Sequence, residues 1–171
     1  YDGHQATILK NARCVGSSFQ RKKVAGLMSN LLFWFGVPFK FLDKGAEALA
    51  AGAAPPPEGG PPAPRVLVTY HGVGDTPDDW FVVWLSPETY RISRIVYIAS
   101  AITKRLEFEG TWERYQDFGG LEVATVRRFA PKRRALAGLA PPVEQQLSSV
   151  IAHQPLADAW FAPPAGCDDI Q

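Results

Sequence analysis

The stretch "WFVVWLSPETYRISRIVYIA", Trp80–Ala99, decides the fold class. Both of its ends are rich in β-branched and aromatic residues, and "SPET" (Ser86–Thr89) between them has proline at the second position of a turn. In the second half polar and apolar side chains partly alternate, which is typical of a strand. We therefore predict two antiparallel strands, Trp80–Leu85 and Tyr90–Ala99, joined as a hairpin.

Three further segments have the composition of strands: Val66–His71, Leu106–Tyr115 and Leu121–Phe129. The last two are joined by "DFGG" (Asp117–Gly120), a second turn signal. Parallel strands need crossovers of a dozen residues or more, whereas these connections are short. The pattern predicts one antiparallel sheet whose apolar face needs a cover.

A helix is predicted upstream, in "RKKVAGLMSNLLFWFG" (Arg21–Gly36), where apolar residues recur at spacings of three and four. It should end at Gly36, before Pro38. The following Ala46–Arg65 is an Ala/Pro/Gly segment with six prolines, which predicts a mobile extended insertion without helix or strand. Near the end, Val143–Gln154 fits a helix and a polar-edged strand equally well on propensity.

The composition and net charge of the chain limit the classes of function that it can have. The chain has 171 residues, 46% of them hydrophobic, and 18 Lys+Arg against 17 Asp+Glu leave a net charge of +1. We expect one domain spanning 1–171, no nucleic-acid partner and no strong electrostatic attraction to a membrane. One basic cluster is a local exception that can meet lipid headgroups or a partner; its members are Arg127, Arg128, Lys132, Arg133 and Arg134.

Neither a metal nor a cofactor is expected. Cys14 and Cys167 have no C-x-x-C spacing, so they form one disulfide or remain two free thiols. The longest apolar run, Val24–Phe39, is shorter than the ~20 residues of a membrane span, so we predict no transmembrane segment. No signal peptide is visible in the chain.

The stretch "VLVTYHGVGDTPDDW" (Val66–Trp80) resembles the strand and His-Gly oxyanion loop of α/β-hydrolases. That fold also needs a G-x-S-x-G nucleophile elbow and parallel strands, and the sequence contains no such pentapeptide. An esterase using the His71-Gly72 loop is therefore disfavoured, and we expect no enzyme. His71 is better explained as the last residue of a strand.

Several phrases, in order, resemble the LolA-like superfamily of periplasmic lipoprotein carriers. They are "YDGHQA" (1–6), "LLFWFGVPFKFLDKGAE" (31–47), "GDTPDDWFVVWLSPETYRISRIVYIAS" (74–100), "WERYQDFGGLEVATVRRF" (112–129) and "PLADAWFAPP" (155–164). The match covers about the C-terminal two thirds of such a domain, so an N-terminal truncation is expected. The proline-rich insertion has no counterpart in the family.

The resemblance implies an α+β fold in which a curved antiparallel sheet, an incomplete barrel, covers at least one amphipathic helix. It favours a strand for Val143–Gln154. It also implies an exported or periplasmic protein that binds a lipid or another hydrophobic ligand without catalysis. The leading alternative is an auxiliary subunit whose sheet is completed by a protein partner.

The expected ligand wall consists of aromatic residues, because five of them fall within nine positions upstream and others lie on the predicted strands. Its candidate members are Phe33, Trp34, Phe35, Phe39, Phe41, Trp80, Trp84, Tyr97, Phe108 and Trp112.

Overall fold

The computed structural model describes residues 6–10, 13–71, 79–98, 106–132 and 142–151. They divide between Lys40 and Phe41 into two compact units, each described here by itself. The first unit contains β1 (Ile8–Lys10), β2 (Arg13–Val15) and α1 (Ser18–Gly36), and the second contains the large sheet.

Helix α1 begins with a capping box, because the Ser17 side chain accepts from the Gln20 backbone while the Gln20 side chain accepts from the Ser17 backbone. Its end at Gly36 confirms the sequence prediction. An amphipathic helix with one buried apolar side is not confirmed: Leu27 and Leu32, two of the apolar residues at these spacings, are 56% and 50% exposed. The short 3-10 helix η1 (Phe39–Leu42) follows α1.

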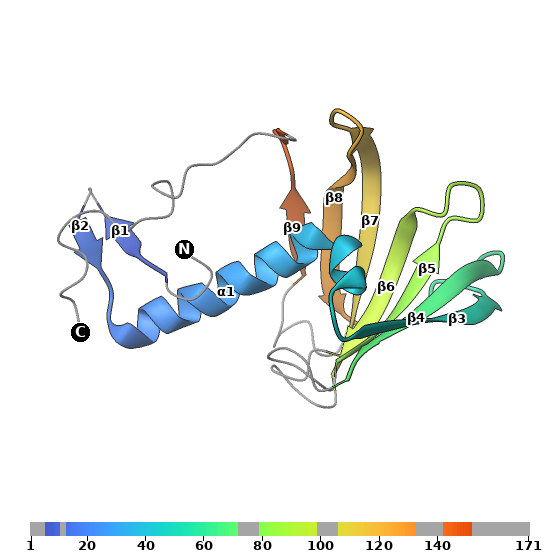
Figure 1. The fold of residues 1–171 in the computed structure, drawn as a ribbon, viewed down its shortest axis with the longest axis horizontal. Helices are drawn as coiled ribbons and strands as arrows, with labels where there is room; N and C mark the ends of the chain where they lie inside the picture. Colours follow the sequence, from blue (N-terminus) through green and yellow to red (C-terminus); the bar gives the residue numbers. More distant parts are fainter. Residues whose placement is uncertain (1–5, 11–12, 72–78, 99–105, 133–141, 152–171) are drawn as a thin grey trace. The chain divides into compact units, whose positions relative to one another are not determined.

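The second unit is built on a seven-stranded sheet (Figure 1). Its strands, in both chain and spatial order, are β3 (Ala46–Ala54), β4 (Ala63–Tyr70), β5 (Trp80–Leu85), β6 (Ile92–Ile98), β7 (Glu107–Asp117), β8 (Glu122–Pro131) and β9 (Val143–Gln146). Every neighbouring pair is antiparallel. The sheet is curved and does not close, so the described chain is α+β as predicted.

Strand β3 corrects the prediction of an insertion without strand over 46–65. All six prolines lie at 55–64, so Ala46–Ala54 keeps every backbone N–H and pairs with β4. Alanine and glycine carry no β periodicity, and the strand forms because a partner lies beside it. Val143–Gln146, in the ambiguous segment, is a strand.

The pairing register separates the sheet into two faces, since residues directly opposite each other lie on the same face. One face contains Phe81, Tyr97 and Phe108, because Phe81 pairs with Tyr97 and Tyr97 pairs with Phe108. We call this the aromatic face; Val68, Val83, Ile95, Trp112, Arg127 and Phe129 also lie on it. The other side is called the opposite face.

Strand β7 shows the division most clearly. Phe108, Gly110 and Trp112 point to the aromatic face and are buried, while glutamates alternate with them on the opposite face. There the glutamates pair with cations on β6 and just after β8, as in Arg94–Glu109 at 2.8 Å and Lys132–Glu107 at 2.5 Å. The main core of the second unit therefore lies on the aromatic face of β5–β8, and a smaller cluster around Trp84 lies on the opposite face.

Candidate functional site

A row of aromatic rings crosses the aromatic face from η1 to β7. The ring of Phe41 lies 5.3 Å from that of Phe81, centroid to centroid, Phe81 lies 5.9 Å from Tyr97, and Tyr97 lies 5.5 Å from Phe108. The last two pairs are stacked, with interplanar angles of 15° and 22°. None of the four side chains is more than 7% exposed. The row is a continuous buried layer of rings contributed by four elements.

A second aromatic pair lies further along β7 and β8. The rings of Trp112 and Phe129 meet edge to face at 5.5 Å. Gly110 makes this possible, because a Cβ there would lie 2.8 Å from Trp112 Cζ3 and 3.0 Å from Phe129 Cδ1. Because glycine has no side chain, the rings of Trp112 and Phe129 occupy the space beside it.

Polar groups lie at one margin of the aromatic face. Burial, and then the charge of Asp79, raise the pKa of the Tyr97 phenol. Burial and Asp43 raise the pKa of Tyr70 to about 12, and the Tyr70 ring contacts Phe81 edge to face at 5.9 Å. Phenols and carboxylates therefore adjoin the apolar row at this margin.

The structure brings together four of the ten predicted wall residues. Phe41, Tyr97, Phe108 and Trp112 belong to the aromatic face. Trp80 and Trp84 do not share it: Trp80 pairs with Ile98 and Trp84 with Arg94, which places both on the opposite face. The expected common wall of strand aromatics is corrected accordingly, because "WFVVW" is apolar at every position and alternation alone does not say which residues point inward.

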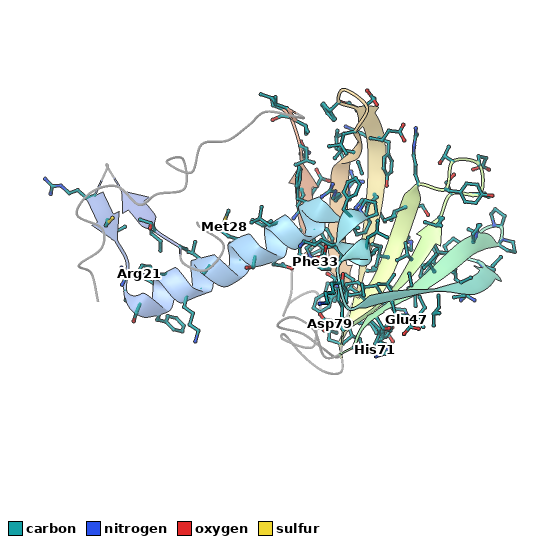
Figure 2. The ribbon with its side chains drawn as sticks, viewed as in Figure 1. Arg21, Met28, Phe33, Glu47, His71 and Asp79 are labelled. Carbon is teal, nitrogen blue, oxygen red and sulfur yellow. The ribbon has the colours of Figure 1, made fainter. Side chains whose placement is uncertain are left out.

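The remaining predicted aromatics belong to the segment around α1. Phe33 and Trp34 contact each other edge to face at 5.2 Å, and Trp34 is 4% exposed. Phe35 and Phe39 are 44% and 57% exposed. Figure 2 labels Phe33 on the last part of α1.

Phe81, Gly110 and Phe129 also belong to this face and were not among the predicted site residues. Phe81 stands in the fully apolar run just described, where no periodic signal separates it from Trp80. A glycine between Phe108 and Trp112 was a usable signal, since glycine within a strand often marks a close approach of another group.

The predicted basic cluster does not form one surface. Arg127 is 2% exposed on the aromatic face, opposite Trp112 in the ladder, and burial lowers its pKa. Arg128 lies on the other side of the sheet, where it donates to Glu113 at 2.6 Å and Glu144 at 2.7 Å. Lys132 is paired with Glu107, and Arg133 and Arg134 lie outside the described residues. Consecutive arginines on a strand point to opposite faces, which sequence clustering does not reveal.

His71 follows the end of β4 and is exposed. Its Nε2 lies 2.9 Å from Glu47 Oε2 and 3.1 Å from Thr69 Oγ1, so it links the ends of β3 and β4 (Figure 2). Gly72 and the rest of the His-Gly loop lie outside the described residues. The sheet around His71 is antiparallel, whereas α/β-hydrolases use parallel strands.

Cys14 is disulfide-bonded, and Cys167, the other cysteine of the chain, lies outside the described residues. Within the described ranges, no three His, Cys, Asp or Glu residues gather as a metal site. None of the described helices is long and apolar enough to cross a membrane.

Comparison with known proteins found no matching family model, no matching curated protein and no matching solved structure. The functional assignment therefore rests on the geometry of the aromatic face.

Proposed function

We propose that this protein binds a hydrophobic ligand, such as a lipid or an acyl chain, on the aromatic face of its open sheet, as a carrier or docking module. The observation that carries the proposal is the row of rings from Phe41 to Phe108, which forms an uninterrupted apolar layer across β5, β6 and β7. These rings are at most 7% exposed, so the ligand reaches them by displacing the groups that now cover the aromatic face.

Two other features support this proposal. An open sheet can adjust its curvature to admit a chain, whereas a closed barrel cannot do so without breaking a ladder. Arg127, on the same face, adds a positive charge suited to an acidic headgroup.

The disulfide at Cys14 supports an exported location, because disulfides form and persist in oxidising compartments. Export would suit a carrier that acts outside the cytoplasm.

Quenching by a brominated fatty acid tests the proposal. We expect dibrominated stearic acid to quench the fluorescence of Trp112, on the aromatic face, more than that of Trp80, on the opposite face. Trp112→Phe should therefore remove most of the quenchable emission, while the matched control Trp80→Phe should retain it. Equal loss in both variants, or no quenching of the parent protein, would contradict the proposal.

A second candidate function is suggested by the sheet edges. Strands β3 and β9 end the sheet, and among the described residues no further strand pairs with the outer edge of either. Such edges accept a strand from a partner, as expected of an auxiliary subunit. Native mass spectrometry of the protein purified gently from its source separates the two functions. A mass of a few hundred daltons that organic solvent removes indicates a bound amphiphile, and a stoichiometric protein chain indicates the subunit.

A further inference from the structure

A row of three buried N–H donors crosses the opposite face of the sheet, away from the proposed ligand face. Arg65, Trp84 and Arg94 lie side by side on β4, β5 and β6, because Trp84 pairs with Arg65 on one side and with Arg94 on the other. The Nε of each arginine and the Nε1 of the tryptophan are buried, and no hydrogen-bond acceptor among the described residues reaches them.

The other nitrogens of the two arginines are already engaged, which fixes both side chains. Arg65 Nη2 donates to the Ala51 carbonyl at 2.9 Å. Arg94 Nη1 lies 2.8 Å from Glu109 Oε2, and its Nη2 lies 2.8 Å from Glu58 Oε1. These bonds at the Nη atoms hold each guanidinium group in place. The unsatisfied Nε atoms of Arg65 and Arg94 are therefore fixed as well.

The surroundings make these donors costly to leave unsatisfied. Trp84 packs in a cluster with Ala63 and Val96, and Trp80 and Val82 adjoin it. A buried donor without an acceptor costs about 1–3 kcal/mol, so a cluster of three needs a physical explanation. An acceptor placed among them would satisfy several donors at once in an apolar setting, where hydrogen bonds to a charged group are strong.

We propose that the Arg65–Trp84–Arg94 row is an oxyanion-binding site, taking the phosphate or carboxylate group of a ligand. Glu58, on the proline-rich connection between β3 and β4, acts as its internal competitor. Its carboxylate holds Arg94 while remaining 52% exposed, whereas the Arg94 side chain is only 14% exposed. An external oxyanion reaches the buried donors when Glu58 leaves Arg94.

Tryptophan indole resonances in ¹H–¹⁵N NMR spectra of the full chain test this site. Trp84→Phe assigns the Trp84 resonance by its disappearance. Sodium phosphate and sodium acetate are then titrated separately, with sodium chloride at matched ionic strength as the reference. We expect a saturable shift of the Trp84 resonance with an oxyanion and not with chloride. Tighter binding of phosphate would identify a phosphate ligand, and tighter binding of acetate a carboxylate.

Two substitutions test the roles of the side chains. Glu58→Gln should raise the oxyanion affinity by a factor of about 5, because an exposed ion pair contributes up to about 1 kcal/mol. Arg94→Gln should lower it by at least about tenfold. Glu88→Gln removes a glutamate that bonds to Ser86 on the β5–β6 turn and should leave the affinity unchanged.

The proposal would be overturned by a Trp84 resonance that does not move, or that moves equally with chloride. An unchanged affinity in Glu58→Gln would also overturn it. That variant changes an exposed loop residue and keeps the test decisive if Arg94→Gln does not fold.

Discussion

Tyr97 and Phe108 face each other across the β6–β7 ladder with their rings stacked, 5.5 Å apart and inclined by 22°. The pair is the last link of the row that runs from Phe41 through Phe81, and it connects that row to strand β7. Both side chains are 7% exposed, and the stability of the second unit should therefore depend on them.

Replacing Phe108 by Ala should lower the free energy of unfolding by about 3–5 kcal/mol, because it removes a buried ring and leaves a cavity. Urea denaturation followed by circular dichroism measures the change. Phe19→Ala, at a residue 75% exposed, is the matched control and should change stability by less than about 0.5 kcal/mol. Similar losses in the two variants would mean that the Phe108 ring is not packed as described.

Gly110→Ala should destabilise the protein by about 1–3 kcal/mol, since the new Cβ meets the rings of Trp112 and Phe129. The same substitution at Gly26 has open space around it and lies inside α1, so it should stabilise the helix by about 0.5–1 kcal/mol. Thermal unfolding of both variants distinguishes crowding from helix propensity by the sign of the change. A stabilising Gly110→Ala would contradict the proposed ring packing.

Neighbouring arginines should respond differently to the same substitution. Arg127→Gln should lower the free energy of unfolding by about 3 kcal/mol. The Arg127 side chain is 2% exposed, and its removal leaves the buried groups around it without their charged partner. Arg128→Gln, on the solvated face, should have a small effect, and that effect should diminish further in high salt. Denaturation midpoints at low and high salt provide the measurement. Equal costs would indicate that the two arginines do not lie on opposite faces.

Stability should fall at high pH through Tyr115. Burial raises the pKa of its phenol from 10.0 to about 12, and the hydroxyl donates to the Ile92 carbonyl at 2.8 Å. Below pH 10 the phenol is protonated in both folded and unfolded chains, and its contribution is complete. Between pH 10 and about 12 the unfolded chain releases the proton first, so the contribution is lost as pH rises.

Tyr115→Phe should therefore flatten the decline in the free energy of unfolding over this range. Tyr90→Phe, at an exposed side chain, should leave the decline as in the parent protein. A pH dependence unaltered by Tyr115→Phe would show that this phenol does not titrate differently in the two states.

The disulfide at Cys14 predicts that thiol assays find no free thiol in the denatured, unreduced protein and two after reduction, one for each cysteine of the sequence. Cys14→Ser should lower stability by about 2–4 kcal/mol. Free thiols before reduction would contradict the bond.

Strand composition and turn chemistry were sufficient to predict β4 to β8, which follow the expected segments to within a few residues. The end of α1 was also predictable, because Gly36 followed by Pro38 stops a helix. Strand β3 was not predictable, since its alanines carry no hydrophobic periodicity. They form a strand because β4 pairs with them.

By itself, the sequence determined which segments alternate between two faces, because side-chain direction along a strand follows from local backbone geometry. Only the tertiary structure decided which alternating sets share a face. That choice is made by the register between strands, where a slip of one residue would reverse every side chain. The register joins Tyr97 to Phe108 and places Trp84 between Arg65 and Arg94, and these two arrangements define the candidate sites.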